Sequence, residues 1–174
     1  MGKILYSIFN TPSGTRQASW MGITANDYGL KTIVLPQING KKTLSLIKDS
    51  VHADDLLRDE EYFKEINCLL IDYFEGEKVV FNYPLNLRFA GEFKKKVWYA
   101  TQSIPYGEIR TYQFIAKEIG NPKAFRAIGQ ALKKNPLPII IPCHRVIQSN
   151  GKSGGFSGGI AFKKTLLRIE KITL

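Results

Sequence analysis

Cysteine and histidine are scarce in this chain, with two of each among 174 residues. Cys68 and Cys143 lie 75 positions apart, so they do not form the paired Cys-x-x-Cys spacing of a zinc site, and two histidines do not complete one. We therefore expect no structural metal and no cofactor.

Long apolar runs are also missing. No stretch approaches the ~18 consecutive apolar residues of a membrane-spanning helix, and residues 1–7 lack the apolar core of a secretion signal. We therefore expect no membrane partner and a location in the reducing cytoplasm.

Acidic residues are scarce in the second half of the chain. Residues 1–84 hold nine Lys or Arg against eleven Asp or Glu, whereas residues 85–174 hold sixteen against four. This surplus favours a polyanionic partner, although a solvated basic surface also explains it. The turn Asn82-Tyr83-Pro84 marks a seam, and we place one domain at 1–84 and a second at 85–174.

The first half has the pattern of strands and one helix. Extended stretches at 3–9, 16–24 and 30–35, the last two joined by a turn at 26–29, predict an antiparallel meander. Apolar residues at spacings of three and four predict a helix from Asp59 to Phe74, ended by Gly76. Cys68 lies inside this helix, and we interpret it as a buried, inert thiol rather than a reactive one.

The second half has the pattern of helices, so the fold class is α+β. The first helix carries one buried stripe, made of Phe89, Phe93, Val97, Ala100 and Ile104. Thr111 caps a second helix that ends at Gly120, with Phe114, Ile115 and Ile119 facing inward. Asn121-Pro122 begins a third that runs to about Lys134. The last two helices and their short joint predict a helix-turn-helix.

The third helix combines positive charge with small side chains. Its exposed basic residues are Lys123, Arg126, Lys133 and Lys134, and its small residues are Ala124, Ala127, Gly129 and Ala131. So smooth a helix can approach a DNA groove closely, but the same residues also suit tight helix packing. For minor-groove docking, Arg126 is the candidate for insertion, because arginine both stacks and donates hydrogen bonds.

The candidate nucleophile follows an apolar run. Ile139–Ile141 predicts a buried strand that presents Pro142-Cys143-His144-Arg145-Val146 at its end, a position typical of a working thiol. Adjacent side chains of an extended chain point to opposite faces, so His144 reaches the Cys143 sulfur only through a water or a local turn.

Glycines gather between Gly151 and Gly159. Gly151-Lys152-Ser153 resembles the end of a phosphate-binding loop, but Val146 stands where that pattern requires glycine. A loop that closes over a flat ligand fits better, with Phe156 to stack and Ser157 to donate a hydrogen bond. A plain surface loop is the alternative.

These motifs together resemble one family. The run Pro142–Val146, with Asn135-Pro136 before it and Ser157-Gly158-Gly159 after it, is similar to the O6-alkylguanine-DNA alkyltransferases. Asn121–Ala124 and Arg126–Gly129 resemble that family's recognition helix. The likeness covers Phe89 to Glu170 and is weak before it. It implies a ribonuclease H-like first domain, a monomer, and repair of O6-alkylguanine, with O4-alkylthymine as a second substrate.

The resemblance also implies a role for each site residue. Cys143 would accept the alkyl group, His144 would take its proton through a water, Glu170 would orient His144, and Asn135 would brace the turn. Tyr112 would donate to guanine N3 and Ser157 to O6, and the carbonyls of Cys143 and Val146 would accept from the exocyclic amine. The other implied pocket residues are Phe156 and Gly158, where Phe156 departs from the family's usual tyrosine.

Double-stranded DNA is the implied partner, bound through the minor groove with the damaged base turned out of the stack. Arg126 would fill the vacated place. The residues implied to lie near the DNA backbone are Thr111, Gln113, Asn121 and Ser149, and Tyr112 is a further implied DNA-binding residue. Some relatives carry zinc in the first domain, but Cys68 is its sole cysteine here, so we expect no metal.

Two other functions remain open on the sequence. A non-catalytic protein that binds alkylated DNA would share the DNA-binding motifs but replace the acceptor, which this chain retains as Cys143. A helix-turn-helix transcription factor would read the major groove and usually dimerise. The small-residue third helix and the embedded thiol argue against the second alternative.

Overall fold

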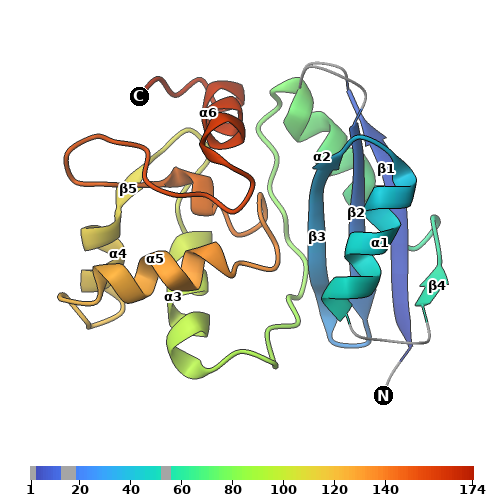
Figure 1. Cartoon of the computed structure of the whole chain (residues 1–174), viewed down its shortest axis with the longest axis horizontal. Helices are drawn as coiled ribbons and strands as arrows, with labels where there is room; N and C mark the ends of the chain where they lie inside the picture. The colour runs from blue at the N-terminus through green and yellow to red at the C-terminus, as the bar shows by residue number, and fades with distance from the viewer. Residues whose placement is uncertain (1–2, 13–18, 52–55) are drawn as a thin grey trace. The chain divides into compact units, whose positions relative to one another are not determined.

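The computed structural model describes residues 3–12, 19–51 and 56–174 (Figure 1). The chain divides into two compact units, residues 1–87 and residues 88–174. Within the described ranges, no helix is long and apolar enough to cross a membrane.

Unit 1 contains a four-stranded sheet in the order β3-β2-β1-β4. β1 (Ile4–Thr11), β2 (Ser19–Asn26) and β3 (Gly29–Gln37) form the predicted antiparallel meander, although residues 16–18 of the second predicted stretch lie outside the described ranges. β4 (Leu56–Arg58), which the sequence pattern did not reveal, pairs parallel with β1.

Two helices accompany this sheet. α1 (Gly40–Val51), also unpredicted, buries Ile47 against the sheet residue Gly22, where an added Cβ would come within 2.7 Å of the Ile47 side chain. α2 (Lys64–Glu75) starts five residues later than predicted and ends at Gly76, as expected. The burial predicted for Cys68 is wrong. Its thiol is exposed, because the inward stripe of α2 runs through Ile66, Asn67, Leu70, Tyr73 and Phe74.

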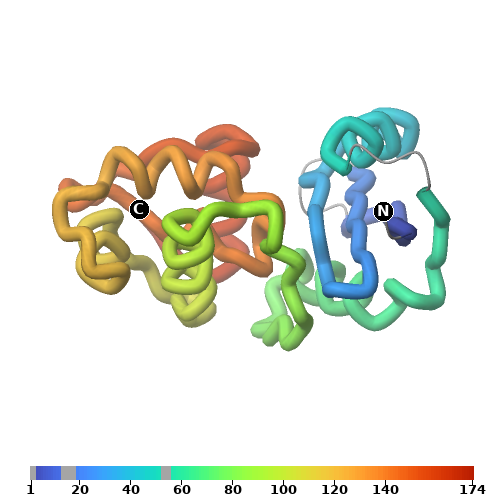
Figure 2. The backbone as a smooth tube through the Cα atoms, turned by 90° about the horizontal axis from the view of Figure 1, so that it is seen from below, coloured from blue at the N-terminus to red at the C-terminus, as the bar shows by residue number. Residues whose placement is uncertain are grey.

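Unit 2 contains four α-helices and a pair of two-residue strands. α3 (Glu92–Gln102) and α5 (Phe125–Lys133) pack side by side (Figures 1 and 2), and the buried Trp98 indole donates from one to the Ala131 carbonyl of the other at 3.0 Å. α6 (Ile160–Ile169) packs against the short turn Cys143–Arg145. β5 (Arg110–Thr111) and β6 (Val146–Ile147) pair in parallel.

The stripe predicted for α3 is only partly buried. Val97 and Ile104 are buried as expected, but Phe89 is 60% exposed because it precedes the helix and does not share its face. Trp98 and Thr101 fill the inward positions instead.

The next two helices are short. α4 (Tyr112–Glu118) has the predicted cap, since Phe114 N–H donates to the Thr111 hydroxyl at 3.1 Å, and Gly120 follows it with a φ of +71°. Phe114 is 39% exposed rather than inward, because the buried side of so short a helix is occupied by Ile115 and Ala116. α5 begins at Phe125, not at Pro122, because residues 121–124 form a turn closed by an Ala124 N–H to Asn121 carbonyl bond.

Candidate active site

Cys143 opens a single turn of 3-10 helix, η2 (Cys143–Arg145), rather than ending a strand. Ile139–Ile141 is not the predicted strand. Ile139 has a φ of +78° and Ile141 bridges back to Pro138, so the run is a tight turn. The turn is closed by Ile141 N–H, which donates to the Leu137 carbonyl at 2.8 Å, and the Ile141 carbonyl accepts from a nearby side chain.

That side chain is the buried amide of Asn135. Its oxygen accepts from Leu137 N–H at 3.0 Å, and its nitrogen donates to the Ile141 carbonyl at 2.8 Å. The same nitrogen lies 3.1 Å from the Cys143 sulfur and donates to it. Asn135 therefore fixes the turn and gives the sulfur a hydrogen bond at the same time.

The sulfur is buried but borders open space. Cys143 is 4% exposed and contributes to the wall of a cavity of about 600 Å³. Residues of α4, α5 and the glycine-rich segment complete this wall, among them Tyr112, Gly129, Leu132 and Phe156. A planar group of the size of a nucleobase therefore has room beside the thiol.

Two opposing effects act on the Cys143 thiol. Burial raises its pKa above the ordinary value, because the desolvated thiolate is disfavoured. The Asn135 hydrogen bond and the positive charge of Lys163 act in the other direction. The pKa of Tyr112 is raised chiefly by burial and secondly by the charge of Cys143, so its hydroxyl stays protonated at neutral pH.

His144, Arg145 and Glu170 form a buried, hydrogen-bonded cluster. His144 Nε2 lies 2.7 Å from Glu170 Oε1, while Arg145 donates to both Glu170 oxygens at 2.8 and 2.9 Å. Arg145 also donates to the Ile104 carbonyl at 2.6 Å. Sequence patterns gave no role to Arg145, yet the structure makes it the cation that holds this carboxylate.

The cluster sets two protonation states. Burial alone would raise the pKa of Glu170, but the hydrogen bonds and charges of His144 and Arg145 outweigh it and lower the pKa to about 2. Burial lowers the pKa of His144 more than Glu170 raises it. At neutral pH the pair therefore combines an ionised Glu170 with a neutral imidazole able to accept a proton.

Lys163 is a site residue that the sequence reasoning missed. Its side chain is fully buried, and its ammonium donates to the carbonyls of Val146 and Ser153, each at 2.5 Å. Burial lowers its pKa to about 8, against the opposing effect of Cys143. A signal was present, since Lys163 precedes the buried residues Leu166 and Leu167 at helical spacing.

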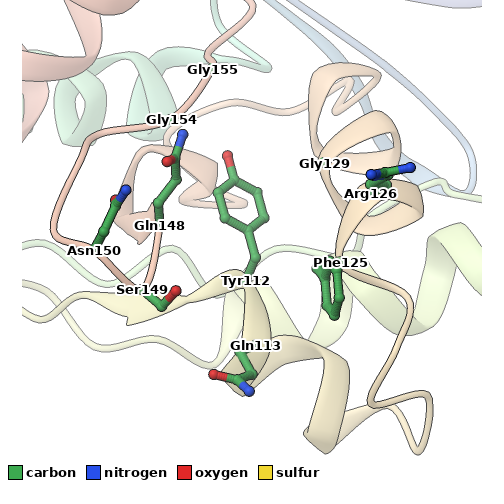
Figure 3. Close-up of a pocket in the computed structure, with 10 residues that line it drawn as sticks. All are labelled: Tyr112, Gln113, Phe125, Arg126, Gly129, Gln148, Ser149, Asn150, Gly154 and Gly155. Carbon is green, nitrogen blue, oxygen red and sulfur yellow. The ribbon is translucent and has the colours of Figure 1, made fainter.

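A second cavity of about 500 Å³ shares Tyr112, Gly129 and Gly155 with the first. Its wall includes the predicted DNA-binding residues Gln113, Arg126 and Ser149. Figure 3 shows the Tyr112 ring standing between the Gln148–Gly155 segment and α5, with Arg126 pointing away from it. Phe125, the first residue of α5, belongs to the wall of the same cavity as Tyr112 and Gln113 (Figure 3).

Gly154, like Arg145 and Lys163, is a site residue to which the sequence analysis gave no role. It has a φ of +69°, and an added Cβ would lie 2.8 Å from the Tyr112 hydroxyl oxygen. Glycine is needed here both for the left-handed backbone and for the close approach of the ring.

The remaining predicted residues lie around these two cavities. Asn121 is exposed in the turn before α5, and Val146 is buried at the start of β6. Phe156 packs against Phe162 of α6 with ring centroids 6.4 Å apart. Ser157 and Gly158 are exposed loop residues that line neither of the two cavities.

No group of three or more His, Cys, Asp and Glu side chains with the geometry of a metal site occurs among the described residues. The chemistry of the site therefore has to be argued from the thiol, the imidazole, the carboxylate and the buried cations described above.

Comparison with known proteins identifies the family. The family model of the 6-O-methylguanine DNA methyltransferase DNA-binding domain matches residues 92–172. A methylated-DNA--protein-cysteine methyltransferase of Methanosarcina acetivorans is 42% identical over 165 residues, which are 95% of this chain and 97% of the relative.

Solved structures agree over nearly the whole chain. A crystal structure of Mycobacterium tuberculosis OGT in complex with DNA has a TM-score of 0.78 at 34% identity, covering 96% of this chain and 92% of the other. The O6-methylguanine-DNA methyltransferase of Pyrococcus kodakaraensis has a TM-score of 0.70 at 25% identity, covering 97% and 99%. The mixed α/β architecture, the sequence match and the cysteine beside a cavity together establish that this chain belongs to the methylated-DNA--protein-cysteine methyltransferase family.

Proposed function

We propose that the protein repairs DNA by direct reversal, moving the alkyl group of O6-alkylguanine onto the Cys143 sulfur. One observation carries this proposal: a cavity of about 600 Å³ borders a thiol that is followed in the chain by a buried, neutral histidine bonded to an ionised glutamate. O4-alkylthymine, which presents an alkyl group on a similarly placed oxygen, is a second substrate of the proposal.

The reaction is a single displacement. The Cys143 thiol gives its proton to His144 through a water, and the thiolate attacks the alkyl carbon. A carbon–sulfur bond forms while the carbon–O6 bond breaks, and its electron pair leaves with guanine. Burial raises the pKa of Cys143 and lowers the pKa of His144, which opposes this proton transfer. In its favour, His144 is unprotonated, and the imidazolium it becomes has the ionised Glu170 as its partner.

Recognition of the extruded base uses groups at the cavity wall. Tyr112 retains its proton and can donate to guanine N3, while Phe156 supplies an aromatic face. The carbonyls of Cys143 and Val146 each accept one hydrogen bond already, from Val146 N–H and Lys163. Each keeps a second lone pair for the exocyclic amine. Ser157 and Gly158 reach the base if their loop closes over it.

DNA binding is assigned to α4 and α5 as a helix-turn-helix that enters the minor groove. The charge surplus of residues 85–174 supports this assignment. Arg126 is exposed beside the second cavity and is the proposed occupant of the place vacated in the base stack. The proposed backbone contacts are Thr111, Gln113, Asn121 and Ser149.

The proposal extends to the whole protein in three respects. Unit 1, with its sheet and two helices, is a ribonuclease H-like support, and unit 2 carries DNA binding and alkyl transfer, close to the predicted 1–84 and 85–174 division. The protein acts as a monomer, because one cavity and one thiol in unit 2 hold the proposed chemistry. Its location is the cytoplasm.

Each molecule acts once under this proposal. A thioether offers water no easy displacement, so the alkylated protein is the end product. The experiment is incubation with duplex DNA that contains O6-methylguanine, followed by intact mass and peptide mapping. The expected result is one methyl group per molecule on Cys143, lost in Cys143→Ala and retained in Cys68→Ser.

Repeated turnover, or a label on Cys68, would contradict the proposal. Binding of the alkylated duplex without any mass change would favour the alternative of a non-catalytic lesion-binding protein.

A further inference from the structure

Lys163 is an unusual cation in unit 2. Its side chain is fully buried on the inward face of α6, and it touches two segments that are far from it in the chain. The bond to Val146 reaches the residue that follows η2, and the bond to Ser153 reaches the segment Gly151–Gly159. The Lys163 ammonium therefore joins two parts of the site: the turn η2 with Val146 after it, here called the acceptor turn, and the glycine-rich loop Gly151–Gly159.

A purely structural role does not account for the charge. Backbone carbonyls are neutral, and a neutral donor would satisfy both without the desolvation cost of a buried ammonium. Among the described residues, no carboxylate forms an ion pair with Lys163, and the ionisable group whose charge acts on it is Cys143. The positive charge of Lys163 can therefore stabilise the negative charge of the Cys143 thiolate.

We infer that Lys163 is a positioning residue for alkyl transfer: its ammonium holds the acceptor turn against the glycine-rich loop and is the cation against which the Cys143 thiolate forms. The inference rests on the proposed function, because it takes Cys143 to be the alkyl acceptor. Its test measures the reactivity of the thiol itself and needs no DNA. Lys163 neither gives nor takes the transferred proton, which goes to His144, and it remains an ammonium below its pKa of about 8.

Other groups around the thiol have separate effects. Tyr112 of α4 faces Cys143 with a neutral hydroxyl, and Asn135 donates to the sulfur. The charge of Arg145 is balanced by Glu170, which leaves Lys163 as the uncompensated cation acting on Cys143 within the described residues.

The test compares Lys163→Gln with Lys164→Gln. Lys163→Gln keeps a side chain that can donate two hydrogen bonds, and Lys164→Gln removes the same charge from an exposed position of the same helix. Each protein, without DNA, is labelled with iodoacetamide over a range of pH. The labelling rates of Cys143 and Cys68 are read separately by peptide mass spectrometry, so the exposed Cys68 serves as an internal reference thiol.

The inference predicts that Lys163→Gln moves the pH midpoint of Cys143 labelling upward by about one unit or more, the usual effect of removing a close opposite charge. At pH 7 this is roughly a tenfold slower rate. The Cys68 midpoint stays fixed, and Lys164→Gln changes neither. An unchanged Cys143 midpoint in folded Lys163→Gln would overturn the inference.

If Lys163→Gln does not fold, a measurement on the wild-type protein tests the same inference. Lysine labelled with ¹³C at Cε is titrated by NMR in the wild-type protein before and after Cys143 is methylated. Because coupling between two sites is reciprocal, Lys163 must titrate at lower pH once the sulfur can no longer ionise. Identical titration in both forms would overturn the inference. Failure of the wild-type protein to accept methyl from DNA would instead refute the proposed function.

A separate observation concerns Phe125. It is the first residue of α5 and is 49% exposed, although a phenylalanine ring is costly to leave in water. It lines the cavity of about 500 Å³, and its neighbours Lys123 and Arg126 are exposed cations that suit a polyanion. The rest of the helix surface near it is small, with Ala124 and Ala127.

We propose that Phe125 is an apolar contact to duplex DNA, packing its ring against a sugar or base edge in the groove that α5 enters. This rests on the proposed function. Phe125→Ala is expected to weaken binding of an unmodified duplex roughly tenfold, within the range of aromatic contacts to bases. Its salt dependence stays unchanged because no phosphate contact is lost.

Phe89→Ala is the matched control, since Phe89 is also an exposed aromatic of unit 2 but lines neither cavity. Equal affinity of Phe125→Ala and wild type, or a changed salt slope, would refute the contact and leave the proposed function intact. A wild-type protein that does not bind duplex DNA would refute the proposed function itself.

Discussion

The substitution Glu170→Gln tests the physical basis of the buried cluster. It keeps the shape of the side chain but removes the charge that accepts two hydrogen bonds from Arg145 and one from His144. Arg145 is 8% exposed, and its acceptors are then neutral, namely the Ile104 carbonyl and the amide oxygen that the variant introduces. The variant therefore leaves a guanidinium charge buried without an anion.

The expected loss is large. Removing one partner of a buried ion pair typically destabilises a protein by about 3 to 5 kcal/mol, which is a substantial part of the ~5 to 15 kcal/mol that stabilises most domains. Urea unfolding of wild type and Glu170→Gln measures it as a difference in the free energy of unfolding. In the double variant with Arg145→Met, most of this loss is recovered, because the stranded charge is gone.

The pH dependence of the free energy of unfolding gives a second measure of the contribution of Glu170. The pKa of Glu170 is lowered to about 2 in the folded protein, so its contribution to stability is complete above the unfolded pKa of about 4.3 and is lost as pH falls toward 2. The linkage amounts to roughly 3 kcal/mol. The lowered pKa of His144, caused chiefly by burial, adds a loss that begins near pH ~6.5. Glu170 contributes only to the loss of stability that occurs below pH ~4.5.

Two outcomes would refute this reasoning. A loss of less than about 1 kcal/mol in Glu170→Gln would place the pair in the range of exposed salt bridges. Strict additivity with Arg145→Met would show that the two charges do not stabilise one another.

Three further predictions concern single residues. Asn135→Ala removes the hydrogen bond to the Cys143 sulfur and takes away the side-chain acceptor of the buried Leu137 N–H; it should cost about 1 to 3 kcal/mol in urea unfolding and raise the pH midpoint of Cys143 labelling, and an unchanged midpoint would show that the amide does not act on the thiol. Gly154→Ala should reduce transfer at least tenfold and cost about 1 kcal/mol, because its Cβ meets the Tyr112 hydroxyl; full activity in a transfer assay would contradict the close approach. Cys68→Ser should change the unfolding free energy by less than about 0.5 kcal/mol, since the thiol is exposed, and a larger loss would mean that it packs in the core.

Periodicity identified most elements but misplaced parts of them. The meander of β1–β3 and the cap at Thr111 follow from local signals, and both are confirmed. β4 and α1 were missed. β4 has three residues and depends on pairing with β1, which is a contact distant in sequence. The exposure of Cys68 depends on which face of α2 meets the sheet, and apolar residues on several faces of that helix left the choice open.

The family assignment was available from the local motifs, because Pro142–Val146 and the residues around it are contiguous in sequence, and the comparisons confirm it. The conformation of the site was not. Ile139–Ile141 has the composition of a strand, but the Asn135 amide bonds to the Ile141 carbonyl and to Leu137 N–H, and Ile141 N–H closes a turn onto the Leu137 carbonyl.

The sequence alone determined which chemical groups are present: one thiol with a histidine beside it, a basic second half and a glycine-rich loop. The tertiary structure decided how strongly these groups act on one another's charges and pKa values. Lys163 and Arg145 are ordinary basic residues in the sequence, and they acquire their effects on Cys143 and Glu170 only by burial. The physical reason is that water screens charges at the surface, whereas a desolvated cation acts strongly on the few groups that share its interior.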